Sequence, residues 1–207
     1  MLSVAIEQHA LATTAMADSA PDVDDDDEDA LARRFASGDP SAFDEIVTLH
    51  RERVTGLAFR LLGWRDGEVE DVVQEVFLSV LNHLGRFRGE SKVGTWLTVI
   101  TINKCRTHRT RWFARWRMLR RRLKEAPSEP APAADEGVRR DETSARVREA
   151  VQKLRPRDRE VIVLHYLEQN DLAEMAGLLG VSQNAVEVRL HRARQRLKGL
   201  LKDVVEA

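Results

Sequence analysis

Hydrophobic residues recur every three or four positions along most of this chain, which is the spacing of one face of an α-helix. The most regular run covers residues 67–85, where apolar positions follow the helical period without a break. Similar stripes predict helices over residues 28–37, 41–62, 95–122, 147–154 and 156–167. No stretch alternates between apolar and polar residues as a half-buried strand does. The pattern therefore predicts an all-α protein.

Turn-forming and capping residues separate these helices. A Gly-Asp-Pro sequence at 38–40 ends the first helix, Ser41 is placed to cap the second, and Gly63 is placed to end it. Residues 86–94, RFRGESKVG, read as a polar loop that contains one aromatic residue, Phe87.

Two more helices with a tight turn between them are predicted at residues 171–201. Asp171 and Glu174 have the spacing of a capping box. Gly180 can adopt the left-handed conformation that ends a helix, and Ser182 can cap the next one. This arrangement favours a DNA-binding helix-turn-helix. The alternative is an ordinary helical hairpin with a solvated basic face.

The second helix of this pair has one apolar stripe and one polar face. The stripe consists of Val186, Leu190, Ala193 and Leu197. The opposite face suits the major groove, since Asn and Gln can pair with adenine, Glu can accept from cytosine and Val can contact a thymine methyl group. Its residues are Asn184, Glu187, Val188, His191, Arg192 and Gln195. Charge for DNA phosphates comes from Arg189, Arg192, Arg194, Arg196 and Lys198.

The outward face of the helix at 67–85 combines acidic residues with a leucine. Its members are Asp71, Gln74, Glu75, Leu78 and Asn82. Such a face indicates either a partner surface or a single exposed apolar side chain of the kind common on soluble proteins. The pattern alone favours neither.

The helix at 95–122 is apolar at first and becomes strongly basic from Asn103 onward, with Trp112, Phe113 and Trp116 among the basic residues. Aromatic rings can stack on unpaired bases while arginines contact phosphates, which favours a nucleic-acid surface over merely solvated arginines. We expect the tryptophans themselves to be packed.

The formal net charge of −1 conceals a strong asymmetry, because acids concentrate at residues 18–29 and bases at 104–124 and 189–198. Residues 1–28 are predicted to be a disordered acidic extension, either a solubilising tail or a DNA mimic that folds back on the basic segments. The dense basic segment 115–124 is expected to hold DNA or to pair with residues 22–29.

Residues 125–143 are rich in Pro, Ala and acidic residues, which predicts a flexible linker. The chain then divides into an acidic extension and two small helical domains at 29–124 and 144–207.

Several classes of protein are disfavoured. The single cysteine, Cys105, cannot form an internal disulfide and is expected to be a small packing residue in a reducing cytoplasm. We expect no catalytic residues, cofactor or metal, because the sequence lacks a phosphate-binding Gly loop, a His–Glu metal spacing and a nucleophile elbow. There is no signal-peptide pattern and no segment apolar enough to span a membrane. A cytoplasmic binding protein is favoured over an enzyme.

Three stretches, in this order, resemble the extracytoplasmic-function (ECF) group of bacterial RNA polymerase sigma-70 factors. EDVVQEVF at 70–77 is similar to the polymerase-binding helix of that family. FRGESKVGTWLTVITINKCRTHR at 87–109 is similar to its promoter-melting and minus-ten segment. LRPRDREVIVLHY at 154–166, followed by the helix-turn-helix, is similar to its minus-thirty-five domain. The resemblance covers residues 29–201 and implies a sigma region 2-like bundle joined flexibly to a region 4-like helix-turn-helix domain.

The resemblance also implies roles for individual residues. Those expected on the polymerase are Asp71, Gln74, Glu75 and Leu78. Those expected at the minus-ten DNA are Asn82, Phe87, Arg88, Lys92, Trp96, Asn103, Lys104, Arg106 and Arg109. Those expected at the minus-thirty-five DNA are Ser182, Gln183, Asn184, Glu187, Val188, His191 and Arg192.

The implied partners are core RNA polymerase, through the clamp of its largest subunit and the flap of the second, promoter DNA and an anti-sigma factor. The free protein is expected to be monomeric. Two rivals are a stand-alone helix-turn-helix regulator and a protein that sequesters polymerase or another sigma factor. An RNA-modifying enzyme is a more distant third.

Overall fold

The computed structural model describes residues 25–64, 66–89, 91–123 and 142–201, and all regular structure within them is helical. They form two compact units, one containing α2 to α5 and the other α6 to α9. The predicted all-α class with two helical domains is confirmed. Most of the acidic extension and most of the linker lie outside the described residues. Across the described helices, none has both the length and the apolar character needed to cross a membrane.

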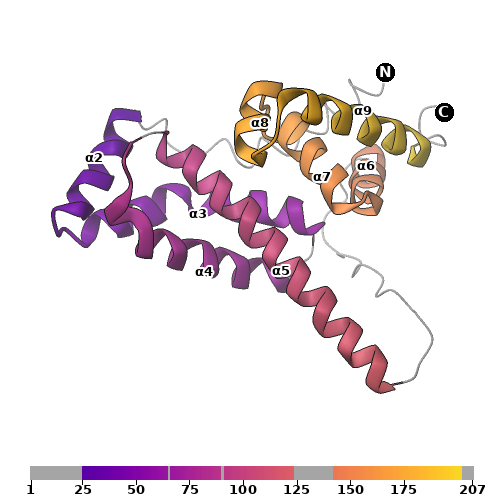
Figure 1. Cartoon of the computed structure of the whole chain (residues 1–207), viewed down its shortest axis with the longest axis horizontal. Helices are drawn as coiled ribbons and strands as arrows, with labels where there is room; N and C mark the ends of the chain where they lie inside the picture. Colours follow the sequence, from indigo (N-terminus) through magenta and orange to yellow (C-terminus); the bar gives the residue numbers. More distant parts are fainter. Residues whose placement is uncertain (1–24, 65, 90, 124–141, 202–207) are drawn as a thin grey trace. The chain divides into compact units, whose positions relative to one another are not determined.

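The amino-terminal unit contains α2 (Asp25–Ala36), α3 (Ser41–Leu62), α4 (Asp66–His83), the 3₁₀ helix η1 (Leu84–Arg86) and α5 (Val93–Leu123). Helices α3, α4 and α5 pack against one another, and α2 packs on α3 and η1. The carboxy-terminal half of α5, the longest helix, extends beyond the rest of this unit (Figure 1). The core forms where the predicted apolar stripes meet, and its fully buried side chains include Ile46, Leu57, Val72, Val73, Leu84, Leu97 and Ile102.

Four helices begin earlier than predicted: α4 by one residue, α5 by two, α2 by three and α6 by five. α2 begins at Asp25, inside the segment predicted to be disordered. Acidic residues in a first turn interact favourably with the helix dipole, and Glu28 contacts both α3 and α5. α5 begins at Val93 rather than at residue 95, and Val93 is fully buried.

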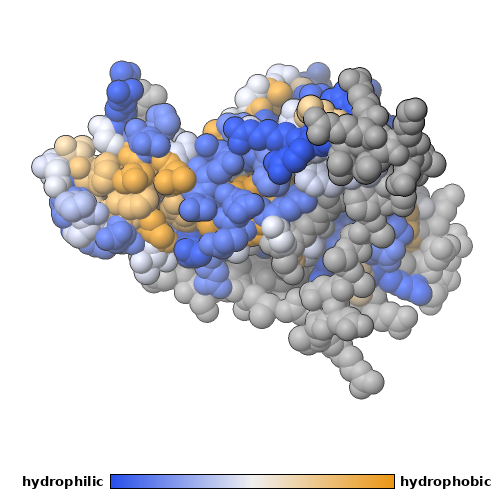
Figure 2. All heavy atoms as spheres, turned by 90° about the horizontal axis from the view of Figure 1, so that it is seen from below, coloured by the Kyte–Doolittle hydropathy of each residue, from blue (hydrophilic) through white to orange (hydrophobic). Residues whose placement is uncertain are grey.

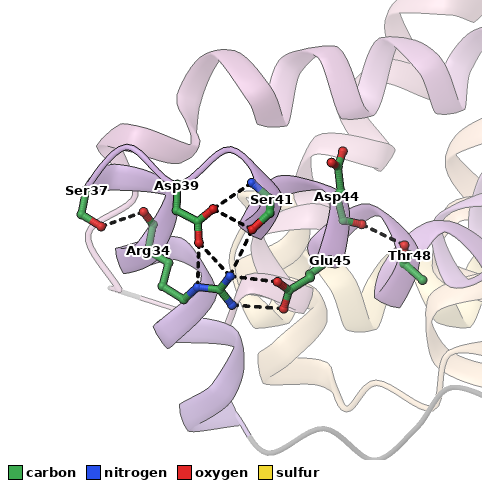
Figure 3. A network of polar contacts seen from close by, with 7 residues as sticks. All are labelled: Arg34, Ser37, Asp39, Ser41, Asp44, Glu45 and Thr48. Atoms are coloured by element: carbon green, nitrogen blue, oxygen red, sulfur yellow. Dashed lines mark hydrogen bonds and ion pairs between the residues drawn. The ribbon is translucent and has the colours of Figure 1, made fainter.

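The turn between α2 and α3 corrects the predicted role of Ser41. Pro40 is the N-cap of α3, and Ser41 is its first residue. Asp39 Oδ1 accepts hydrogen bonds from the backbone N–H of Ser41 at 3.0 Å and from its hydroxyl at 2.6 Å. Arg34 of α2 donates to Asp39 at 2.7 Å and to Glu45 of α3 at 2.9 Å (Figure 3). The Ser41 hydroxyl and the Arg34 guanidinium hold the pKa of Asp39 below its ordinary value.

The carboxy-terminal unit contains α6 (Glu142–Lys153), α7 (Pro156–Ile162), the π-helical turn η2 (Val163–Leu167), α8 (Leu172–Leu179) and α9 (Gln183–Leu200). Pro156 lies at the start of α7 as predicted. The Arg159 side chain donates to the carbonyls of Val151 and Leu154, each at 3.3 Å, where α6 ends. These bonds satisfy carbonyls that a helix end leaves without intrahelical partners. The π-helical turn was not predicted.

Candidate polymerase and nucleic-acid interfaces

The turn between α8 and α9 has the predicted capping geometry. Asp171 Oδ1 accepts from the backbone N–H groups of Ala173 at 2.7 Å and Glu174 at 2.8 Å, and Glu174 accepts from the Asp171 N–H at 2.8 Å. Gly180 has φ of 65°, and Ser182 accepts from the N–H of Ala185 at 3.3 Å. Local side-chain chemistry therefore fixes where α9 begins, and with it the direction of the side chains along α9.

One face of α9 is buried and the other is open to solvent. Val186, Leu190, Ala193 and Leu197 are buried, as the stripe predicts. The exposed face carries the side chains expected at the minus-thirty-five DNA, namely Ser182, Gln183, Asn184, Glu187, Val188, His191 and Arg192. Its donors, acceptors and one apolar group match the kinds of edge that base pairs present in the major groove.

Two of the arginines that were expected to contact phosphates are instead held within the carboxy-terminal unit. Arg194 donates to the Tyr166 hydroxyl at 2.8 Å and lies 3.0 Å from Nε2 of His165. Arg196 pairs with the largely buried Asp158. Both arginines therefore tie α9 to α7 and η2. Among the predicted phosphate contacts, Arg192, Arg196 and Lys198 lie on exposed positions, and Arg189 is half-buried.

The outward face of α4 is more hydrophobic than the sequence predicted. Asp71 and Gln74 are exposed, and the Leu78 side chain is 52% exposed. Leu81, one of the regularly spaced apolar positions of the 67–85 run, is 41% exposed and lies one turn after Leu78. Figure 2 shows a continuous hydrophobic area on the side of the amino-terminal unit that α4 forms, bordered by hydrophilic residues. An exposed apolar area with a charged border is typical of a protein–protein contact.

Glu75 differs from the other residues predicted on this face, because it already has a partner within the unit. Its Oε1 accepts a hydrogen bond from Nη1 of Arg111 on α5 at 3.0 Å. Both side chains are partly exposed, so this ion pair adds little to stability. Glu75 therefore connects the predicted polymerase face of α4 to the basic part of α5.

The residues predicted at the minus-ten DNA lie on the end of α4, on the following loop and on α5. Asn82 is exposed, and its side-chain amide donates to the Leu78 carbonyl at 2.9 Å. Phe87 of the loop and Trp96 of α5 are half-buried, and their ring centroids are 5.2 Å apart. Further along α5, Asn103 is exposed, whereas Lys104, Arg106 and Arg109 are half-buried; Arg88 and Lys92 are exposed on the loop.

The basic half of α5 carries a cluster of aromatic rings. Trp112 and Trp116 are half-buried and stack on each other with centroids 6.2 Å apart, while Phe113 is exposed and meets Trp112 edge to face. Glu28 contacts Gly94, near the start of α5. Arg115, where the basic end of α5 begins, follows Gly94 by 21 residues, which at ~1.5 Å per residue is about 31 Å along the helix. This distance excludes pairing of Glu28 with that basic segment.

Comparison with known proteins identifies both units. Residues 46–117 match the family model of Sigma-70 region 2, and residues 144–197 match that of Sigma-70, region 4. The chain belongs to the sigma-70 family. RNA polymerase sigma factor CarQ of Myxococcus xanthus is 31% identical over 81% of this chain and 94% of CarQ. The ECF RNA polymerase sigma factor SigM of Mycobacterium tuberculosis is 31% identical over 83% of this chain and 83% of SigM.

A solved structure supports the same assignment. The structure of CnrH in complex with the cytosolic domain of CnrY superimposes with a TM-score of 0.58, at 33% identity, over 84% of this chain and 96% of CnrH. The protein is thus an ECF sigma factor, which binds core RNA polymerase and promoter DNA and directs promoter-specific transcription initiation. A match to both sigma regions in one chain disfavours the stand-alone regulator. Sigma factors are initiation factors rather than enzymes.

Proposed function

We propose that the two units of this sigma factor divide its contacts. The α4 face at Asp71, Gln74, Glu75 and Leu78 binds the clamp of the largest polymerase subunit, and Leu81 belongs to the same contact. The support for this assignment is the exposed apolar pair with acidic neighbours on a helix that otherwise packs in the core. An acidic border also favours a basic surface on the polymerase.

The end of α4, the loop at 87–92 and α5 contact the minus-ten element. The support is the group of exposed polar and half-buried basic residues that follow one another there, next to the Phe87–Trp96 ring pair. Capturing an unstacked base offsets an unpairing cost of a few kcal/mol, so promoter melting needs no chemical step by the protein. The protein accordingly acts without catalysis or a cofactor.

The carboxy-terminal unit binds the minus-thirty-five duplex with the exposed face of α9, while the same unit contacts the polymerase flap. The support is the capped turn, which presents Asn184, Glu187 and Val188 in the first turns of α9, where helix-turn-helix proteins contact base edges. The phosphate contacts come from the exposed Arg192 and Lys198 rather than from Arg194 and Arg196.

An anti-sigma factor is proposed as the regulatory partner, because the similar CnrH was solved in complex with the cytosolic domain of CnrY. The protein works in the cytoplasm, where core polymerase and the chromosome are found, and is monomeric when free. Binding of an anti-sigma factor over the α4 face would exclude polymerase by competition for the same apolar surface.

The experiment that tests this function is run-off transcription with bacterial core polymerase, with and without the protein, on fragments of the source genome. New transcripts with defined start sites are expected, and the DNA upstream of those sites gives the two promoter elements. Core binding without any transcript would contradict the proposal and favour the sequestering protein. Repeating the assay with a chain that begins at residue 25, and so keeps α2, separates that outcome from inhibition by residues 1–24.

A further inference from the structure

An acidic residue of α2 reaches the start of the helix that carries the minus-ten residues. Glu28 Oε2 accepts a hydrogen bond from the backbone N–H of Gly94 at 3.2 Å, across 66 positions of sequence. Gly94 is the second residue of α5, so its N–H is one of the donors that a helix start leaves without an intrahelical acceptor. The Glu28 side chain is only 14% exposed. A carboxylate in this position also interacts favourably with the helix dipole.

The first turn of α5 is held from a second direction by α3. Glu28 Oε1 lies 3.3 Å from Nε2 of His50 on α3, which is itself buried. A Cβ atom at Gly94 would lie 2.8 Å from Nη1 of Arg53 and 3.8 Å from Cε1 of His50. The Thr98 hydroxyl donates to the Gly94 carbonyl at 2.8 Å, within the same turn. α2, α3 and α5 therefore meet around one backbone position.

The residue after Glu28 lies near an earlier position of the same loop. Asp29 Oδ2 lies 3.9 Å from the place where a Cβ atom of Gly89 would be, and Gly89 has φ of 68°. A side chain at that φ would be strained. The neighbouring α2 and η1 also pack on each other. Two consecutive carboxylates thus lie near Gly89, within the loop proposed to capture a minus-ten base, and at Gly94, just after that loop.

We infer that Glu28 is a positioning residue for promoter opening: it fixes the start of α5, and with it the minus-ten loop, without touching DNA. The inference rests on the proposed function of residues 87–92. Base capture requires a loop already held in the geometry of the complex, because ordering it on binding would cost free energy. A buried carboxylate that accepts a backbone N–H provides such a fixed point, and hydrogen bonds to charged acceptors are the stronger ones.

The test compares Glu28→Ala, Glu28→Asp and Glu28→Gln in the full chain, each assembled with core polymerase. The promoter is one located by run-off transcription, labelled with 2-aminopurine in its minus-ten element to report unstacking. Glu28→Ala is expected to lower the equilibrium constant for opening about tenfold. Glu28→Asp, which withdraws the carboxylate by one methylene group, is expected to lower it several-fold. Glu28→Gln should stay within threefold of wild type, because its amide oxygen still accepts from Gly94.

The matched control is Glu45→Ala, which removes the Arg34 ion pair between α2 and α3; among the described residues, the hydrogen bonds of the Glu45 side chain are with Arg34. It should open the promoter as wild type does. Core polymerase affinity should change less than twofold in every variant, because a contact at the start of α5 acts on the loop and not on the α4 face. Wild-type opening by both Glu28→Ala and Glu28→Asp would overturn the inference. So would an equal loss of opening and of polymerase affinity, which is the signature of a merely structural residue. Failure of the wild-type protein to open any promoter would instead contradict the proposed function.

Discussion

Individual side chains divide into those whose role follows from local sequence and those whose role depends on a distant partner. The caps at Asp171 and Ser182 were predictable, because each bonds within three residues of itself. The inward role of Arg194 was not, since its partner Tyr166 is 28 positions away. Periodicity places a side chain on a face of its helix, but the length of an arginine lets it reach across to a neighbouring helix.

His50 gives the amino-terminal unit a predictable pH dependence. Burial and the nearby Arg53 lower the pKa of His50 to about 4. The unfolded chain takes up a proton below about pH 6.5 while the folded unit does not, so stability is complete above that pH and is lost as the pH falls toward 4. Between pH 7 and pH 5 this loss amounts to at most about 2 kcal/mol. Glu28 lies 3.3 Å from the His50 ring, and its negative charge favours the protonated ring, so it makes this loss of stability smaller.

The measurement is urea unfolding of wild type and His50→Gln at both pH values, followed by tryptophan fluorescence. All four tryptophans lie in residues 64–116, so the signal reports the amino-terminal unit alone. His50→Gln should lose less stability than wild type between pH 7 and pH 5. Equal losses would mean that Glu28 stabilises the protonated ring and that His50 is not neutral in the folded unit.

Base recognition by α9 is also decided residue by residue. Glu187→Gln exchanges a pure acceptor for a group that also donates, so the preference at one base pair of the minus-thirty-five element should change by ~1–3 kcal/mol. Competition binding of holoenzyme to promoters varied at single positions measures this change. Lys198→Ala is the control, because losing a phosphate contact should weaken binding to all sequences about equally. An equally uniform loss for Glu187→Gln would remove Glu187 from the base-reading face.

At the scale of elements, the sequence predicted which segments are helical but not all of their ends. The stripes on α3, α4 and α9 and the turn at Gly180 correspond closely to the structure. Glu28 joins the first turns of α2 and α5, both of which begin earlier than predicted, through a contact that no local pattern contains. The exposed Leu81 belongs to the regular stripe of α4, and only the placement of the neighbouring helices leaves it uncovered.

The apolar face of α4 yields a prediction for this whole element. Replacing Leu78 and Leu81 together by Ser should lower core polymerase affinity at least tenfold, because an exposed apolar pair at the centre of a contact is desolvated on binding. Stability should change by less than about 1 kcal/mol, since neither side chain is buried in the core. Fluorescence anisotropy of labelled protein titrated with core polymerase measures the affinity.

Leu200→Ser is the matched control for this experiment. Leu200 is 43% exposed, comparable to Leu81, but lies at the end of α9. It should lower the affinity for core polymerase far less than the double variant does, because Leu200 is not on the α4 face. A double variant at Leu78 and Leu81 that binds core polymerase as tightly as wild type would remove both leucines from the proposed polymerase contact.

At the scale of the molecule, the sequence was most informative where charge and composition change over long stretches. Composition marks the acidic start and the basic half of α5. It also marks the Pro- and Ala-rich segment before α6, which separates two helical units that each have their own core. What composition could not reveal is how the acids of α2 are used. Glu28 is built into the amino-terminal unit, so the acidic run is in part a structural element rather than only a tail.

The final prediction concerns the covalent link between the two units. Each unit alone offers a small DNA contact, and tethering both to one chain on one polymerase raises the effective concentration of the second contact to the millimolar range. At micromolar protein, cutting the link should therefore lower promoter-specific transcription by roughly 10²-fold.

A protease site inserted after residue 130 allows the same protein to be assayed before and after cleavage, with the uncut chain and protease-treated wild type as controls. The two fragments should remain folded, because each unit has its own core. Circular dichroism should therefore show the same helix content before and after cleavage. Full transcription after complete cleavage would mean that polymerase holds each unit independently, and that the chain between them contributes no effective concentration at the promoter.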